Sequence, residues 1–162
     1  MPTIAPCLWM DKQGEEAANF YVSIFPNSRI TNITRYGDVG QEIHGGKPGE
    51  VLTVEFELDG QPFTTLNGAP LFQFSEAISF QIDAPTQDKI DSFWDKLTAD
   101  GGEPSQCGWL KDKYGVSWQV FPFQLSRELF GNPNGPKSQR AFSAMMGMTK
   151  IDIAALQKAY EG

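Results

Sequence analysis

The chain has 162 residues, which suits one ordinary domain or two small modules that share a core. Its 20 acidic and 13 basic residues give a formal charge of -7, which disfavours nucleic acid and anionic membrane surfaces as partners. The start, Met1-Pro2-Thr3-Ile4, lacks a basic and apolar targeting segment, and no run approaches the roughly 20 apolar residues of a membrane span, so we expect a cytoplasmic protein.

The first half of the chain is predicted to form a strand, a helix and three more strands. Helix positions Ala17, Phe20, Tyr21 and Ile24 follow the spacing of one apolar face. The strand Val51 to Leu58 alternates cleanly, with Leu52, Val54, Phe56 and Leu58 on one face. The other predicted elements are a strand from Ile4 to Met10, a helix from Gly14 to the stop at Pro26-Asn27, and strands from Arg29 to Tyr36 and from Gln61 to Asn67.

A glycine-rich loop joins the second and third of these strands. It covers residues 37–49 and holds His44, the single histidine of the chain. Loops of this length are often lids over a binding site, so we expect a mobile loop here.

The same order of elements begins again in the second half. A strand over Ala77 to Ala84 and a helix over Gln87 to Asp100 precede a short strand near Glu103 to Gln106. A hairpin follows, with arms near Cys107 to Leu110 and Ser117 to Pro122 around the turn Asp112-Lys113-Tyr114-Gly115. The apolar positions of the two helices differ by 73 (90 − 17 for Ile90 and Ala17), and Phe93, Trp94 and Leu97 match Phe20, Tyr21 and Ile24. Each half is therefore predicted to be a βαβββ module, produced by duplication.

The tail is predicted to add helices to an α+β domain. We expect one domain over 1–162, with module one at 1–74, module two at 75–123, and a C-terminal loop and helices at 124–162. The helices are expected around Gln139 to Met146 and after Thr149, with Asp152 as the cap. Their apolar surface predicts packing on a sheet or a homodimer interface, and it comprises Ile153, Leu156 and Tyr160 beside Met145, Met146 and Met148.

Two βαβββ modules side by side resemble the vicinal oxygen chelate superfamily, which includes glyoxalase I, extradiol dioxygenases and the fosfomycin and bleomycin resistance proteins. Three segments are similar to its PhnB-like family, which also carries the label 3-demethylubiquinone-9 3-methyltransferase domain. They are FTTLNGAPLFQFSEAISFQI (Phe63 to Ile82), CGWLKDKYGVSWQVFP (Cys107 to Pro122) and AFSAMMGMTKIDIAALQKAYEG (Ala141 to Gly162). The resemblance implies a glyoxalase/bleomycin resistance/dioxygenase-like fold, in which each module forms a half-barrel and the two halves enclose a pocket.

The resemblance also implies where a metal would bind. Metal-using members take His, Glu or Gln ligands from the first and last strands of each module, and only Gln119 matches such a position here. The other positions offer Leu8 to Met10, Thr64 to Leu66 and Ile78 to Phe80. We therefore expect no metal and no cofactor. The glycines of 37–49 lie between two strands rather than before a helix, so the residues do not support binding of S-adenosylmethionine.

The strands that line the cavity in proteins of this fold give the candidate ligand-binding residues. Aromatic rings beside amides and hydroxyls suit a small neutral or cationic organic ligand. The candidates are Trp9, Phe63, Thr65, Asn67, Ser79, Trp109 and Gln119. Structural alternatives remain for Trp109 as a core residue, for Asn67 as a turn residue before Gly68, and for Thr65 and Ser79 as ordinary strand residues with satisfied hydroxyls. No catalytic residue is assigned.

Two other functions stay open. One is a metal-dependent enzyme of the glyoxalase or dioxygenase type, using Gln119, His44 and a carboxylate such as Glu42, Glu50 or Glu55. The other is the methyltransferase of the family label. Cys107 lacks a neighbouring base in the sequence, and Cys7 lies far from it, so both cysteines are expected to be free thiols.

Overall fold

The computed structural model describes residues 4–162. The expectation of no targeting segment depends partly on Met1, Pro2 and Thr3, which lie outside these residues. The chain divides into two compact units, Met1–Gln73 and Phe74–Gly162, so the tail falls within the second unit.

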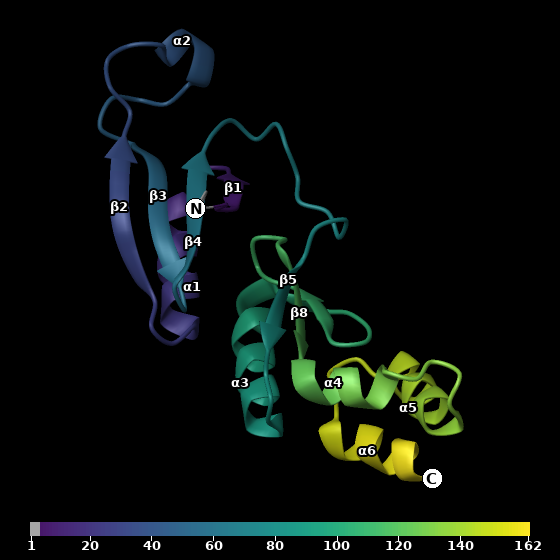
Figure 1. The fold of residues 1–162 in the computed structure, drawn as a ribbon. Helices are drawn as coiled ribbons and strands as arrows, with labels where there is room; N and C mark the ends of the chain where they lie inside the picture. Colours follow the sequence, from purple (N-terminus) through teal and green to yellow (C-terminus); the bar gives the residue numbers. More distant parts are fainter. Residues whose placement is uncertain (1–3) are drawn as a thin grey trace. The chain divides into compact units, whose positions relative to one another are not determined.

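The first unit is a four-stranded sheet with a helix across one face (Figure 1). Its strand order is β1-β4-β3-β2, with β1 parallel to β4 and the other pairs antiparallel. The strands are β1 (Cys7–Met10), β2 (Arg29–Arg35), β3 (Val51–Leu58) and β4 (Gln61–Asn67), and the helix is α1 (Gly14–Ile24). The first strand begins later than expected, at Cys7.

An aromatic stack joins α1 to this sheet. The ring of Tyr21 stacks on Phe56 at 6.2 Å between centroids, and Phe56 stacks on Phe63 at 5.6 Å. All three side chains are buried, and offset aromatic stacking adds to the free energy of apolar burial. The face of the sheet that contacts α1 is therefore the core of the first unit.

A register shift in β3 changes which side chain reaches the opposite face. Pairing with β2 passes from Thr34–Thr53 to Arg35–Val51, which leaves Leu52 as an extra residue. A bulge of this kind redirects a side chain, and Leu52 lines a groove together with Leu66 of β4. The expectation that Leu52 shares a face with Val54 is therefore wrong, because the sequence alternation does not reveal the bulge.

The second unit repeats the topology of the first. Its sheet has the order β5-β8-β7-β6, and β5 is parallel to β8, as β1 is to β4. The elements are β5 (Phe80–Asp83), α3 (Gln87–Thr98), the short helix η1 (Ala99–Gly101), β6 (Glu103–Pro104), β7 (Trp109–Lys111) and β8 (Ser117–Phe121). The predicted α+β fold of two βαβββ modules is confirmed, although β5 is shorter than expected.

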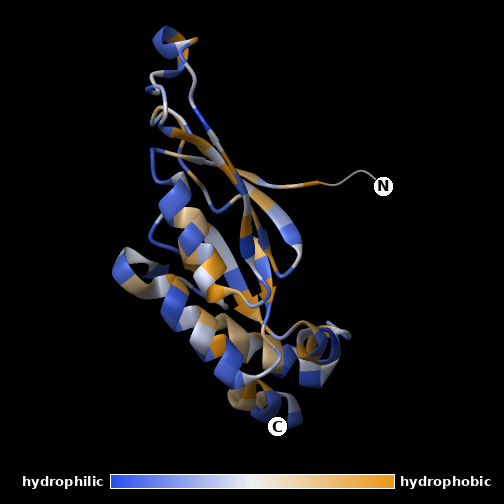
Figure 2. Cartoon of the chain, turned by 90° about the vertical axis from the view of Figure 1, so that its left-hand side faces the viewer, coloured by the Kyte–Doolittle hydropathy of each residue, from blue (hydrophilic) through white to orange (hydrophobic). Residues whose placement is uncertain are grey.

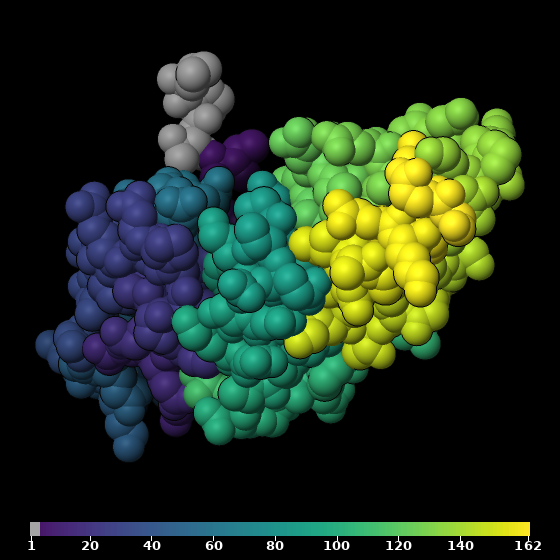
Figure 3. All heavy atoms as spheres, turned by 90° about the horizontal axis from the view of Figure 1, so that it is seen from below, coloured from purple at the N-terminus to yellow at the C-terminus, as the bar shows by residue number. Residues whose placement is uncertain are grey.

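Three helices complete the second unit: α4 (Phe123–Phe130), α5 (Pro136–Met146) and α6 (Ile153–Glu161). The sequence reading missed α4. The cap at Asp152 is confirmed, because its Oδ1 accepts from the amide of Ala155 at 2.9 Å. Leu156 is buried, and α6 (yellow) lies against the green atoms of the preceding helices in Figure 3. The apolar face of α6 is thus covered within its own unit, and the exposed apolar side chains of this region are Phe142 and Met146 of α5.

The glycine-rich loop contains a short helix, α2 (Gln41–His44), that the sequence reading did not predict. At the top of Figure 2 this segment carries both hydrophilic and hydrophobic residues. Across residues 4–162, no helix combines the length and apolar character needed to cross a bilayer.

Candidate functional site

Two cavities lie in the first unit, and both are lined by the paired rings of Tyr36 and His44, called the partition below. We call them the polar cavity, of about 410 Å³, and the apolar groove, of about 400 Å³. Both volumes fall in the range of pockets that bind small organic molecules. They share Tyr36, His44 and residues 67–69 as lining, so a change at these residues affects both spaces.

The apolar groove has a floor from the sheet and a wall from the glycine-rich loop. Trp9, Leu52 and Leu66 form the floor on the face of the sheet away from α1, while Val39 and Ile43 come from the loop. Val39 is 89% exposed and Ile43 is 86% exposed. Apolar side chains this exposed are costly in water, so a ligand that covered them would gain binding free energy from their burial.

Trp9 is held at one end of the groove. Its Nε1 donates to the carbonyl of Ala69 at 2.8 Å, and its ring meets Phe72 edge-on at 5.0 Å. A Cβ on Gly68 would lie 2.2 Å from the ring, so only glycine fits there. The indole is therefore positioned before any ligand arrives.

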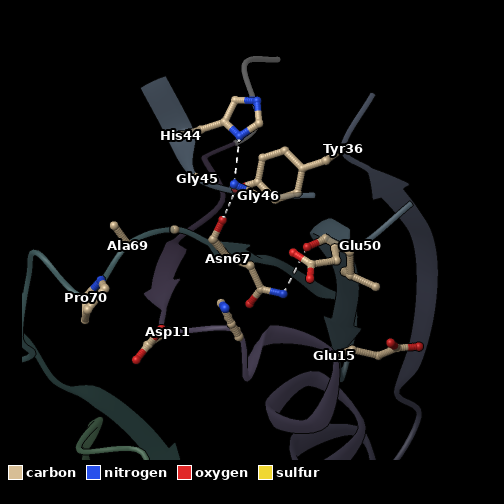
Figure 4. Close-up of a pocket in the computed structure, with 13 residues that line it drawn as sticks. Asp11, Glu15, Tyr36, His44, Gly45, Gly46, Glu50, Asn67, Ala69 and Pro70 are labelled. Atoms are coloured by element: carbon tan, nitrogen blue, oxygen red, sulfur yellow. Dashed lines mark hydrogen bonds between the residues drawn. The ribbon is translucent and has the colours of Figure 1, made fainter. Parts of the chain in front are cut away.

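The polar cavity is acidic. Its charged lining residues are Asp11, Lys12, Glu15 and Glu50, three carboxylates against one ammonium group. Figure 4 shows Asp11, Glu15 and Glu50 around the lower part of this space, beneath the rings of Tyr36 and His44. This charge balance favours a positively charged group over an anion.

The partition between the two spaces is fixed by several interactions. The rings of Tyr36 and His44 stack at 4.4 Å between centroids, and the hydroxyl of Tyr36 donates to the carbonyl of Asn67 at 2.5 Å. The amide of Gly46 donates to Nδ1 of His44 at 3.0 Å, as Figure 4 shows. A Cβ on Gly46 would lie 2.3 Å from the Tyr36 ring, so this close approach requires glycine.

Asn67 connects this partition to the start of α1. Its Oδ1 accepts from the amide of Gly14 at 2.8 Å, and its Nδ2 donates to the carbonyl of Val51 at 3.1 Å. The side chain thus caps α1 from a distant strand while the main chain anchors Tyr36. Asn67 lines both cavities, but its side-chain hydrogen bonds serve the fold.

Two other candidates from the same strand face the helix rather than the groove. Thr65 is fully buried and donates to the carbonyl of Gly14 at 2.9 Å, and Phe63 belongs to the aromatic stack beneath α1. The sequence analysis expected them to line a pocket, whereas in the structure both side chains pack toward α1. The register of β4 turns Phe63, Thr65 and Asn67 toward α1 and Leu66 toward the groove.

The three candidates of the second unit lie close together, with Trp109 on β7, Gln119 on β8 and Ser79 directly before β5. Trp109 and Gln119 are cross-strand partners, and Nε2 of Gln119 donates to Oγ of Ser79 at 2.7 Å. Trp109 also lines a small cavity with Lys111, whose ammonium lies 2.5 Å from Glu76. The hydrogen bond from Lys111 lowers the pKa of the Glu76 carboxyl below its ordinary value. All three candidate side chains are half-buried and neutral.

The side chains proposed as metal ligands of an enzyme are either hydrogen-bonded within the protein or exposed to solvent. Nδ1 of His44 accepts from Gly46, and Nε2 lies 3.1 Å from the carbonyl of Val39. Glu50 accepts from the amide of Lys47 at 3.0 Å, and Glu42 and Glu55 are exposed. Within residues 4–162, no three His, Cys, Asp or Glu side chains lie close enough together to hold an ion.

The sequence reading missed Tyr36, Ile43, Leu52 and Leu66 as lining residues of the first unit. Their one available signal was the presence of Val39 and Ile43 as isolated apolar residues in an otherwise polar, glycine-rich loop. Tyr36 was placed at the end of a strand, and nothing local in the sequence shows that its hydroxyl reaches the end of β4.

Comparison with known proteins places the chain in a family. Residues 2–121 match the family model described as 3-demethylubiquinone-9 3-methyltransferase. The solved structure of a PhnB protein from Bacillus cereus, described with the same methyltransferase label, is 35% identical. It covers 75% of this chain with 99% of its own length, at a TM-score of 0.65. Curated proteins gave no significant match.

A more distant structure shares the fold. A Pseudomonas aeruginosa protein is 15% identical and covers 74% of this chain with 96% of its own, at a TM-score of 0.58. The fosfomycin resistance protein FosX from Listeria monocytogenes, complexed with Mn(II) and sulfate, is 14% identical. It covers 75% of this chain with 89% of its own at a TM-score of 0.49, too low to transfer any residue role.

Proposed function

The chain belongs to the 3-demethylubiquinone-9 3-methyltransferase family, the PhnB-like branch of the vicinal oxygen chelate superfamily, and we propose that it binds a small organic molecule without a metal ion. The ligand's apolar body would lie in the groove of the first unit, against Trp9, Leu52 and Leu66. The observation that carries this proposal is the groove itself, with two strongly exposed apolar side chains on its wall beside a pre-positioned indole.

The neighbouring polar cavity suggests the chemistry of the ligand's other end. Because the carboxylates of Asp11, Glu15 and Glu50 outnumber the ammonium of Lys12, a protonated amine is favoured there. The stacked rings of Tyr36 and His44 line both this region and the groove. The proposed ligand is thus an amphipathic molecule whose polar end is neutral or cationic.

Titration with N-phenyl-1-naphthylamine, a neutral dye that fluoresces in apolar sites, tests the groove. We expect saturable binding that weakens at least about tenfold in Trp9→Ala and in Leu66→Ser, because each variant removes an apolar wall. The control is Ile4→Ser, which alters an apolar side chain that is 86% exposed and lies outside the groove lining. Equal weakening in all three variants would show unspecific adsorption and would refute the groove as the site.

The preference for a cation is tested by competition between 1-hexylamine and 1-hexanol, which differ in the polar end alone. The amine should displace the dye at a concentration about two to five times lower, since an exposed charge pair contributes under about 1 kcal/mol. Glu15→Gln combined with Glu50→Gln should erase the difference. If the alcohol competes as well as the amine in the unaltered protein, the acidic cavity has no part in recognition.

We propose binding rather than methyl transfer, despite the family label. The connection from β1 to α1 consists of Asp11, Lys12 and Gln13, without the glycine-rich turn that brings a backbone close to a nucleotide-like cofactor. Calorimetry with S-adenosylmethionine should give no saturable heat. Saturable binding at micromolar cofactor would favour the methyltransferase instead.

A homodimer is the assembly we propose, on a surface that keeps Met146 of the expected patch but uses Phe142 of α5 in place of the face of α6. Leu156 is buried within its own unit, whereas Phe142 is 51% exposed and Met146 is 54% exposed on α5. Light scattering should give about twice 18.0 kDa, and Phe142→Asp should return the mass to that of one chain. We also propose a cytoplasmic location, which suits the free thiols of Cys7 and Cys107.

A further inference from the structure

Both ring nitrogens of His44 are engaged in a way that only the neutral ring allows. Nδ1 accepts from the amide of Gly46, and Nε2 lies 3.1 Å from the carbonyl of Val39, which requires a hydrogen on Nε2. A second proton would have to enter at Nδ1, where it would face the hydrogen of Gly46. The present arrangement and a protonated His44 are therefore incompatible.

We propose that His44 is a proton-operated latch, which holds the segment 37–46, called the lid below, against the first sheet and releases it on acidification. The inference rests on the proposed function, because it concerns access to the same groove. Val39 and Ile43, which form the loop-side wall of the groove, belong to the lid.

The lid has a fixed base and few other attachments. At its base the amide of Tyr36 donates to the carbonyl of Glu50, and the amide of Gly49 donates to the carbonyl of Tyr36, both at 2.9 Å. Within the lid, the amide of Gly45 bonds back to Gln41 in the single turn of α2. Stacking of the His44 ring on Tyr36 attaches the lid to its base, and the hydrogen bond from Gly46 to Nδ1, inside the lid, fixes the ring in this stacked position.

The surroundings also offer a partner to the protonated ring. The charged groups that line the cavity beside His44 are Asp11, Lys12 and Glu15 from the β1–α1 segment and Glu50 from the start of β3. The lid itself carries Asp38 and Glu42, and Lys47 follows it. Carboxylates dominate this set, so an imidazolium ring that leaves Gly46 is attracted into the polar cavity. The two states of the ring therefore have different partners, as a switch requires.

Release of the latch should weaken ligand binding. The lid supplies the Val39 and Ile43 wall, and a mobile lid must be ordered again before it covers a ligand. The expected direction is tight binding with neutral His44 and weaker binding with the protonated ring. The window from about pH 8 to about pH 5.5 spans the ordinary titration range of an imidazole and lies above that of a carboxyl group.

The latch itself can be measured without any ligand, through amide hydrogen exchange of Gly46 by NMR. Normalised to the intrinsic rate at each pH, the protection of Gly46 should fall about fivefold to tenfold between pH 8 and pH 5.5, the equivalent of one lost hydrogen bond. In His44→Gln, which cannot titrate, protection should be independent of pH. Gly46→Ala should lose the protection at both pH values, whereas Gly37→Ala, with open space around its Cβ, should behave as the unaltered chain does.

Dye titration over the same pH range then separates the two proposals. Binding of N-phenyl-1-naphthylamine that weakens on acidification in the unaltered chain but not in His44→Gln supports the latch. Constant Gly46 protection, or an equal fall in His44→Gln, overturns the latch even if the dye binds. A pH-dependent Gly46 amide without dye binding at any pH upholds the latch and overturns the proposed function.

Discussion

Replacing Asn67 by alanine tests whether one side chain joins the first helix to the partition between the cavities. The substitution removes the acceptor for the Gly14 amide and the donor for the Val51 carbonyl. A buried amide left without a partner costs about 1–3 kcal/mol, and the half-buried carbonyl of Val51 costs less because water reaches it. We expect Asn67→Ala to lower the free energy of unfolding by about 2–4 kcal/mol, a large part of an ordinary domain's stability.

Asn67→Asp is the matched control. It keeps an oxygen for the Gly14 amide and adds a negative charge at the positive end of α1, while it loses the donor to Val51. Its loss should be less than half that of alanine. Urea unfolding followed by circular dichroism measures both values, and exchange of the Gly14 amide assigns the effect to the first unit. An alanine variant within about 0.5 kcal/mol of the unaltered chain, or equal losses in the two variants, would refute the reasoning.

Three predictions concern the second unit. Gln87→Ala should destabilise the second unit by about 1–3 kcal/mol in urea unfolding, because the Gln87 side chain donates to the carbonyl of Ile151 and so holds the C-terminal tail. A loss of stability no larger than that of Gln73→Ala, at an exposed position, would contradict this. Trp109→Ala should leave the protein folded, and a loss of several kcal/mol would instead show a structural tryptophan. The hydrogen bond from Lys150 lowers the pKa of the Asp91 carboxyl from its ordinary value of 3.8. The pair therefore stabilises the fold above pH 3.8, and this stabilisation is lost as the pH falls through the lowered pKa. Lys150→Met should therefore lower the urea midpoint near neutral pH and have little effect at about pH 2. An equal effect at both pH values would show that the Lys150–Asp91 pair does not stabilise the fold.

The fold was largely predictable because its elements follow from short-range sequence patterns of apolar spacing and helix capping. The apolar stripe of α1 returns in α3, and the burial of both agrees: Tyr21 and Trp94 are buried, while Phe20 and Phe93 are half-buried. Asp152 capped a helix as expected because a cap depends on adjacent residues. The helix α4 was missed because it follows Pro122 directly and ends just before the connection 131–135, so its short pattern was interpreted as part of that connection.

The site was harder to predict because it depends on register and on distant partners. The sequence analysis placed Thr65 of β4 on the pocket face, whereas in the structure the half-buried Leu66 lines the groove and Thr65 is buried toward α1. Asn67 was weighed as a ligand residue or a turn residue, whereas it caps a helix that lies far from it in the sequence. Neither the bulge at Leu52 nor the bond from Tyr36 to Asn67 leaves a local sequence signal.

The most direct test of the proposed function is where a small apolar molecule binds on the intact chain. Methyl NMR spectra of protein labelled at Ile, Leu and Val, recorded during titration with N-phenyl-1-naphthylamine, report this position. The account predicts saturable shifts at Ile43, Leu52 and Leu66, with Leu97, buried beneath the second sheet, unchanged. Saturable shifts confined to other methyl groups, with Ile43 and Leu66 unmoved, would contradict it.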